Sequence, residues 1–168
     1  MRRLFILAVT LLAAVVGVAI AVAASGHTSR SAKGGATVSA ERIAGHGTVL
    51  VDAKGRALYR SEQERNGMVL CKGACLSFWQ PLTVRGTPTR GSAAVGKLAV
   101  VKRPDGGRQV TDNGRLLYAF KLDKPGKVTG DGFKDAFGSQ KFTWHLVRPR
   151  GAASTAATPT TMPGYSYP

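Results

Sequence analysis

Cys71 and Cys75 are the two side chains whose type and spacing could support chemistry most directly. The N-terminal segment described below predicts export, and an exported cysteine pair most simply forms a disulfide. Residues four positions apart can reach the Cα separation of about 4.4–6.8 Å that a disulfide requires. A redox-active pair is one alternative, because strain in a short bridge favours exchange. We predict a structural disulfide, and a redox pair or a metal-binding pair remains open.

A metal site would require donors from elsewhere in the chain. Structural zinc is commonly bound by four ligands from paired motifs, whereas this chain has one cysteine pair. Copper(I) could be bound by two thiolates with fewer partners. His145 is a further candidate ligand, although its position next to Trp144 on an expected strand is more typical of a half-exposed sheet residue. We predict no metal and no cofactor, with Cys71, Cys75 and His145 as the candidate ligands if a metal binds.

The sequence contains no recognisable catalytic constellation. It has no Gly-x-Ser-x-Gly nucleophile motif, and no serine lies in a suggestive order with an acid and a histidine. Asp123, Asp131 and Asp135 have the spacing of neither a calcium loop nor a phosphate-binding motif. Asp123 is expected to cap the turn after its strand by accepting backbone N–H bonds. We therefore predict that the protein is not an enzyme.

The elements that must position these residues have the period of two that is typical of strands. Asp105-Gly106 and Asn113-Gly114 supply the positive φ angles of tight hairpin turns. The expected hairpins and strands cover residues 49–60, 98–111, 116–120 and 142–147, with a long loop at 123–141. One short helix is expected from Cys71 to Trp79, because Cys75, Phe78 and Trp79 would share one face of it. The predicted fold is mainly β, an antiparallel sheet of hairpins with one short Cys-containing helix.

The sheet is expected to consist of two degenerate repeats. Gly55-Arg56-Ala57-Leu58-Tyr59 recurs without a gap as Gly114-Arg115-Leu116-Leu117-Tyr118. A shared Gly-Arg-x-Leu-Tyr core at one fixed offset indicates an internal duplication. The second copy continues with Phe120 and Asp123, where the first has Ser61 and Glu64. Leu116, Tyr118 and Phe120 should share a buried face, with Tyr59 in the equivalent place of the first copy.

Tyr118, Phe120 and Asp123 fill the pattern Tyr-x-(Phe/Trp/Tyr)-x-x-Asp, and the chain resembles the bacterial secreted-repeat family, described as predicted lipoproteins with this motif. The first copy retains only Tyr59 of the motif. The resemblance also covers the two cysteines, and it spans most of residues 46–149. It implies export and a repeat architecture but no reaction, because the family is functionally uncharacterised. The lipoprotein label does not carry over, since no cysteine follows the N-terminal apolar run.

The ends of the chain predict export and tethering. Residues 1–24 combine Arg2 and Arg3 with a long apolar run, which indicates a signal peptide or an N-terminal membrane anchor. Residues 25–42 are expected to be a flexible tether, and residues 150–168 a disordered C-terminal tail. Residues 43–149 are the expected β domain, with repeat copies at about 46–84 and 97–149. The predicted location is extracellular, cell-surface or periplasmic.

The formal net charge of +15 favours anionic partners. Basic residues are spread along the chain, and export disfavours a specific nucleic acid, so an anionic cell-wall polymer or lipid head groups are the expected partners. Membrane contact is expected only through the N-terminal segment, and the oligomeric state is left open. The function we favour is an exported, non-enzymatic envelope or secreted module with a binding or structural role. The alternatives are a redox or metal-handling protein that uses Cys71 and Cys75, and a binder of anionic cell-wall polymer.

Overall fold

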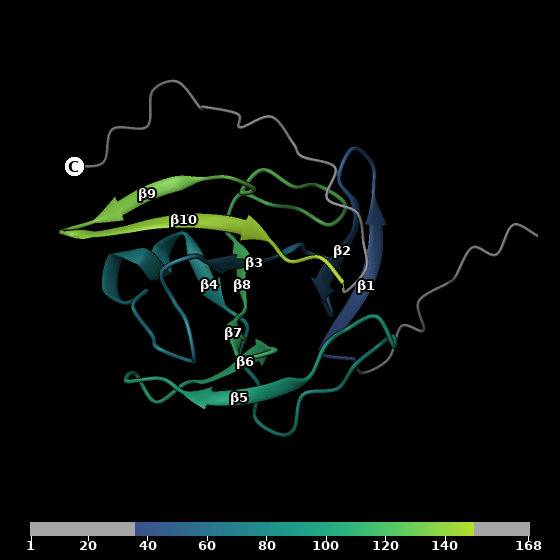
Figure 1. Ribbon diagram of the computed structural model, residues 1–168, viewed down its shortest axis with the longest axis horizontal. Coiled ribbons are helices and arrows are strands. Elements are labelled where there is room, and N and C mark those ends of the chain that lie inside the picture. The colour runs from purple at the N-terminus through teal and green to yellow at the C-terminus, as the bar shows by residue number, and fades with distance from the viewer. Residues whose placement is uncertain (1–35, 150–168) are drawn as a thin grey trace, which may run out of the picture. The chain divides into compact units, whose positions relative to one another are not determined.

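The computed structural model describes residues 36–149 (Figure 1). The predicted signal peptide or anchor, most of the predicted tether and the predicted C-terminal tail lie outside the described residues. Within residues 36–149, no helix is long and apolar enough to cross a membrane. The strands are β1 (Val38–Ile43), β2 (Gly47–Asp52), β3 (Leu58–Ser61), β4 (Trp79–Pro81), β5 (Leu98–Lys102), β6 (Arg108–Asp112), β7 (Arg115–Leu116), β8 (Tyr118–Phe120), β9 (Lys134–Phe137) and β10 (Gln140–Leu146), and the 3-10 helix η1 spans Gly73–Ser77.

The strands form three antiparallel sheets, which confirms the predicted mainly β class. The five-stranded sheet has the order β4-β8-β3-β10-β9, and β5-β6-β7 and β1-β2 form smaller sheets. The two predicted Gly-containing turns are present: Gly106 joins β5 to β6 with φ 84°, and Asn113-Gly114 joins β6 to β7 with φ 49° and 78°. Their positive φ angles are those that Asn and Gly adopt most readily.

The predicted short Cys-containing helix is present, but it is shorter than the expected span from Cys71 to Trp79. Within that span only η1, a 3-10 helix that contains Cys75, is helical, and Trp79 begins β4, where it lies opposite Phe120 of β8. Gly73 has a φ of 57°, outside the right-handed helical region. The apolar spacing of this segment therefore arises from a short turn followed by a strand, and not from one face of a helix.

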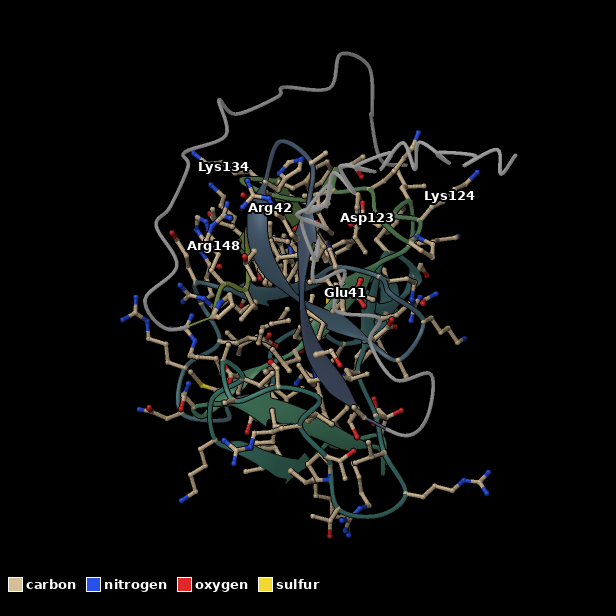
Figure 2. The ribbon with its side chains drawn as sticks, turned by 90° about the vertical axis from the view of Figure 1, so that its right-hand side faces the viewer. Glu41, Arg42, Asp123, Lys124, Lys134 and Arg148 are labelled. Atoms are coloured by element: carbon tan, nitrogen blue, oxygen red, sulfur yellow. A yellow bond between two sulfur atoms is a disulfide. The ribbon has the colours of Figure 1, made fainter. Side chains whose placement is uncertain are left out.

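The first hairpin and the tether boundary also differ from the prediction. β2 pairs along its length with β1, and β1 occupies residues that the sequence placed in the tether. Figure 2 shows β1 with Glu41 and Arg42 labelled on it. The expected turn at Gly55 exists, but it leads from β2 to β3 with a single bridge between Val51 and Ala57. β1 has only two large apolar side chains, Val38 and Ile43, and follows a Ser-, Gly- and Ala-rich segment, so the sequence placed most of it in the tether.

The predicted loop at 123–141 contains a strand. β9 pairs with β10 from Gln140 opposite Phe137 to Thr143 opposite Lys134. The two strands form the hairpin at the upper left of Figure 1. This prediction failed because β9 is short and its residues alternate between exposed and partly buried positions at a sheet edge.

The two copies of the repeat pair with each other at the centre of the five-stranded sheet. β3 of the first copy lies antiparallel to β8 of the second, with the tyrosines of the two copies opposite each other. On the two outer sides, Trp79 of β4 lies opposite Phe120, and Trp144 of β10 lies opposite Ser61. Ser61 and Phe120 occupy equivalent positions of the two copies, two residues after the repeat tyrosine. The order β4-β8-β3-β10 is therefore approximately symmetric about the boundary between β3 and β8.

The hairpins that precede these strands follow the same symmetry. Val38 of β1 lies opposite Asp52 of β2, and Leu98 of β5 lies opposite Asp112 of β6. Both partners are displaced by 60 residues, one more than the offset of 59 between the repeat cores. The first copy thus begins at β1, and the predicted start near residue 46 is too late. Each copy contributes one hairpin and two strands of the symmetric part β4-β8-β3-β10, and the second copy adds the edge strand β9.

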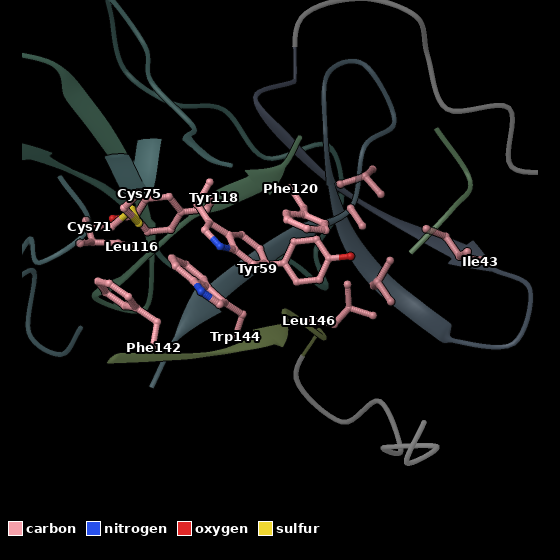
Figure 3. Close-up of a cluster of buried hydrophobic side chains, with 14 residues drawn as sticks. Ile43, Tyr59, Cys71, Cys75, Leu116, Tyr118, Phe120, Phe142, Trp144 and Leu146 are labelled. Carbon is pink, nitrogen blue, oxygen red and sulfur yellow. A yellow bond between two sulfur atoms is a disulfide. The ribbon is translucent and has the colours of Figure 1, made fainter. Parts of the chain in front are cut away.

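The predicted buried faces are confirmed by the main hydrophobic cluster (Figure 3). It contains Leu116, Tyr118 and Phe120 from one strand region and Phe142, Trp144 and Leu146 from another. Trp79 and Trp144, which are equivalent in the two copies, stack with ring centroids 3.9 Å apart and an interplanar angle of 12°. A second cluster packs Leu58 of β3 and Leu117, which lies between β7 and β8, against hairpin residues that include Val38, Leu50 and Val110.

Candidate functional site

Cys71 and Cys75 form a disulfide with a Cα separation of 5.4 Å. Both residues are 0% exposed and belong to the main hydrophobic cluster. Figure 3 shows the bridge at one end of that cluster, beside Leu116 and Tyr118. The carbonyl oxygen of Cys71 accepts a hydrogen bond from Arg103 Nη2 at 2.8 Å. The bridge therefore joins the η1 turn to the core and is not open to solvent.

His145, the other candidate metal ligand, lies on β10 against a carboxylate. Its Nε2 is 2.6 Å from Glu62 Oε1, and both side chains are partly exposed. In the part of the chain that the structure describes, no group of three or more His, Cys, Asp or Glu side chains could hold a metal ion. The structure thus pairs the cysteines with each other and His145 with Glu62.

The motif residues of the two copies bond across the repeat boundary. Tyr59 Oη of the first copy donates to Asp123 Oδ2 of the second at 2.5 Å. Tyr118 Oη of the second copy donates to Glu64 Oε1 of the first at 2.9 Å. Only Tyr59 of the motif is identical in the first copy, but Glu64 makes the hydrogen bond there that the motif aspartate makes in the second copy. The available signal was that Glu64 and Asp123 are separated by the same fixed offset as the two tyrosines.

Each of these carboxylates also binds the loop that follows it. Glu64 Oε1 accepts the backbone N–H groups of Leu70 and Cys71, each at 2.8 Å. Asp123 Oδ1 accepts the Thr129 N–H at 2.9 Å and its hydroxyl at 2.6 Å. Leu70 and Thr129 are again related by the repeat offset, since each follows its acid at the same distance along the chain. Each motif acid therefore binds the loop that follows it in its own copy and the tyrosine of the other copy.

Burial controls the protonation of this network. It raises the pKa of Glu64 and of Asp123 above the ordinary values of these residues. It also raises the pKa of Tyr59 and Tyr118, which therefore remain hydroxyl donors at neutral pH. The positive charge of Arg103 acts in the opposite direction on Glu64, because it favours the ionised carboxylate and lowers its pKa.

Replacing Glu64 by Gln is expected to preserve the fold and to reduce the pH dependence of stability. Because the folded state raises the pKa of Glu64, the folded protein holds this proton at a pH where the unfolded chain has lost it. The free energy of unfolding should therefore fall as the pH rises above the ordinary Glu value of about 4.3. Gln keeps an acceptor oxygen for Tyr118 and removes the charge. Urea unfolding across this range measures the effect, and parallel curves for the two proteins would contradict it.

Asp135, a candidate carboxylate in the sequence, binds the two stacked indoles. Its Oδ2 accepts Trp79 Nε1–H at 2.7 Å, and its Oδ1 accepts Trp144 Nε1–H at 3.0 Å. Burial raises the pKa of Asp135, and the two indole hydrogen bonds oppose that rise. This carboxylate links the edge strand β9 to tryptophans from both copies.

An open groove of about 820 Å³ lies on the surface formed by β3, β7, β9 and β10. Five of its lining residues are basic or can become so: Arg60, Arg115, Lys134, His145 and Arg148. Figure 2 shows Lys134 and Arg148 on one side of the molecule and Asp123 and Lys124 on the other. The groove is a concave basic surface that the sequence did not reveal, because its residues come from separate segments.

The acidic residues of this basic groove are already engaged or buried. Glu62 contacts His145, and Asp131 Oδ2 lies 3.3 Å from Arg148 Nη2. The third carboxylate, Asp112, is 9% exposed. Arg60 and Lys134 have no ion pair with any described residue. With four Lys and Arg against three Asp and Glu, the lining carries a surplus of one positive charge when His145 is neutral.

Arg115 is the most constrained cation of the basic groove. Its Nη2 donates to the carbonyl oxygen of Ser61 at 2.7 Å, and its buried Nε has no hydrogen-bond partner among the described residues. Burial lowers the pKa of the Arg115 guanidinium, and the like charges of Arg60 and Arg65 lower it further. Glu62 and the buried Glu64 offset this effect only in part.

Residues 99–147 match the model of a family described as a secreted repeat of unknown function. A search of curated proteins and a search of solved structures found no match. The matched segment runs from β5 to β10 and contains the complete motif Tyr118, Phe120 and Asp123. It confirms the resemblance predicted from that motif, and the family description supports an exported protein of unknown role.

Proposed function

We propose that this protein is a non-enzymatic binding module that attaches to anionic polymer of the cell envelope through the basic groove. The observation that carries the proposal is the accumulation of Arg60, Arg115 and Lys134 in one open groove whose carboxylates are engaged or buried. Such a concave surface concentrates the field of its charges and attracts counter-ions of opposite sign.

The charge distribution of the whole domain supports this proposal. Residues 36–149 contain nineteen Lys and Arg against nine Asp and Glu. Four of the nine carboxylate side chains belong to buried residues, namely Asp52, Glu64, Asp112 and Asp123. Since these acids face the interior, the solvent-facing surface is more basic than the composition alone indicates.

The positions of the cysteines and of the motif acids favour a structural role for both. A partner thiolate cannot reach Cys71 or Cys75 without opening the hydrophobic cluster, because both are 0% exposed. Glu64 and Asp123 bind tyrosines and backbone N–H groups and do not line the groove. These observations support a binding module over the redox or metal-handling alternative.

The protein is expected to be retained on a glycerol-phosphate wall polymer at low salt and released at high salt. Screening shortens the Debye length from about 10 Å at 0.1 M to about 3 Å at 1 M. Co-sedimentation of the full chain in mild detergent measures this retention. Absence of retention at low salt, or retention that salt does not change, would contradict the proposal.

A pair of matched variants tests the basic groove itself. Arg60→Gln with Lys134→Gln should weaken retention more than Lys124→Gln with Lys127→Gln, although each pair removes two positive charges. Lys124 lies on the other side of the molecule from Lys134 (Figure 2). Equal losses in the two double variants would assign binding to diffuse surface charge and overturn the role of the groove. Stronger retention on anionic lipid vesicles than on the polymer would indicate that the partner is a lipid surface and not the wall polymer.

A further inference from the structure

We propose that Arg115 is the anchoring residue of a phosphate-binding site in the basic groove, with Arg60 and Lys134 as the flanking cations. This inference rests on the proposed function and names the chemical group that the groove recognises. Arg115 and the two flanking cations come from β7, β3 and β9 respectively, so three separate strands supply the positive charges.

The comparison with Arg56, the equivalent residue of the first copy, shows what Arg115 lacks. Arg56 Nε and Nη2 contact Asp52 Oδ2 at 2.9 and 2.8 Å, and its Nη1 donates to Gln80 Oε1 at 2.8 Å. All three nitrogens of the Arg56 guanidinium thus have an acceptor within its own copy. Arg115 has one acceptor, the carbonyl oxygen of Ser61, and its Nε has none among the described residues. The second copy keeps the arginine while leaving part of its donor capacity unused.

The Nε–H of Arg115 is buried and has no acceptor among the described residues, which is unfavourable in the free protein. A buried donor without a partner costs about 1–3 kcal/mol relative to a bonded one. The like charges of Arg60 and Arg65 add repulsion, which is evident in the lowered pKa of Arg115. Arg115 lines the groove and is only partly buried, so an oxyanion there would contact its guanidinium group and reduce the repulsion. An arginine that is unsatisfied in the free protein is therefore prepared for an anionic ligand.

A phosphate group fits this arrangement better than a carboxylate. A carboxylate offers two oxygens in one plane, which suits a single guanidinium fork. A phosphate offers oxygens in tetrahedral directions and can meet two guanidinium groups and an ammonium group that approach from different strands. Arg115 would supply the directional contact, and Lys134, which is exposed at the sheet edge, would supply a flexible point charge.

Inorganic phosphate is the probe for this site. The full chain in mild detergent is titrated with phosphate at constant ionic strength, and the arginine Nε–H resonances are followed by nitrogen-15 NMR. The Arg115 Nε–H signal should shift to saturation, whereas the Arg56 Nε–H signal, whose donor is already bonded to Asp52, should remain in place. The Arg115→Lys variant assigns the signal by its disappearance. An Arg115 signal that phosphate does not move, or that chloride moves equally, would overturn the inference.

Two charge-conserving variants complete the test. Arg115→Lys should weaken phosphate binding about tenfold, which corresponds to about 1.4 kcal/mol, because the directional fork is lost. Arg56→Lys should bind phosphate as the wild type does. Thermal unfolding confirms that both variants are folded, and equal phosphate affinity in Arg115→Lys and the wild type would overturn the inference.

The failure of this site and the failure of the proposed function give different results. Salt-sensitive retention on the polymer without an Arg115 response to phosphate would preserve the proposed function and remove the phosphate site. A saturable Arg115 response without retention on the polymer would preserve the site and remove the wall-binding function. Titration with soluble glycerol-phosphate polymer and with phosphatidylglycerol vesicles separates the two sources of phosphate, since the correct source should move the Arg115 signal at the lower phosphate concentration.

Discussion

Replacing Trp144 by Ala is expected to lower the free energy of unfolding by about 3–5 kcal/mol. Trp144 is 0% exposed and stacks on Trp79 at 3.9 Å, and the edge of Tyr118 packs against it at 5.1 Å. The substitution removes an aromatic stack between the two copies and leaves a cavity. It also removes one of the two indole donors to Asp135. Denaturant unfolding with linear extrapolation measures the loss.

Two further variants separate packing from hydrogen bonding at this position. Trp144→Phe keeps an aromatic ring in the stack but removes the donor to Asp135, so its cost should be intermediate. His145→Ala, one residue further along β10 and partly exposed, should change stability by less than about 1 kcal/mol. A cost for Trp144→Ala as small as that of His145→Ala would contradict the central role of the stack.

Replacing Arg103 by Met is expected to cost about 3–5 kcal/mol, the typical effect of removing one partner from a buried charged network. Arg103 is 2% exposed, and it donates to Gln109 at 2.5 Å, to the carbonyl oxygen of Cys71 at 2.8 Å and to Tyr118 at 3.4 Å. Its positive charge also favours the ionised form of Glu64. The variant would also remove the ion pair of Arg103 Nε with Asp105 Oδ2 at 2.9 Å, and it would leave the Glu64 carboxylate buried with less compensating positive charge.

The Glu64 carboxylate provides the control for this effect. Adding Glu64→Gln to Arg103→Met should recover part of the lost stability, because the uncompensated charge is removed. Acidification should also narrow the gap between Arg103→Met and the wild type, since loss of the cation raises the pKa of Glu64 further and protonation then neutralises it. The exposed Arg108→Met should cost less than about 0.5 kcal/mol. Additive losses in the double variant would show that the two residues do not interact.

The reciprocal bonds of Tyr59 with Asp123 and of Tyr118 with Glu64 give the family motif a physical meaning. Each tyrosine is buried and would lack its acceptor if its own copy folded alone. The pairing of β3 with β8 brings the four groups together. The motif thus specifies the interface between two repeats, and the approximate symmetry of the sheet follows from it.

Local patterns in the sequence determined the parts of the fold that depend on near neighbours. Asn113-Gly114 predicted its turn because few other residue pairs adopt two successive positive φ angles. The alternation of Leu116, Tyr118 and Phe120 predicted a shared face, because successive side chains of a strand point to opposite sides. The proximity of Cys71 to Cys75 predicted a disulfide for the same local reason.

Tertiary pairing decided the elements that local patterns left ambiguous. β1 is a strand because β2 needs a partner, although its polar residues are typical of a tether. Trp79 lies on a strand because it pairs with Phe120, although its spacing from Cys75 matches a helix. The repeat core indicated that the two copies were related, but only their antiparallel pairing brings the tyrosine of one to the acid of the other.

For the basic groove, too, the sequence determined one part and the tertiary structure another. The sequence established that Arg56 and Arg115 are equivalent and that the protein is strongly basic. It could not show that Arg56 is satisfied by Asp52 and Gln80 while Arg115 lies in a groove beside Arg60 with an unbonded Nε. The reason is that the hydrogen bonds and electrostatic environment of a guanidinium depend on which distant strands are adjacent to it, and that adjacency exists only in the folded protein.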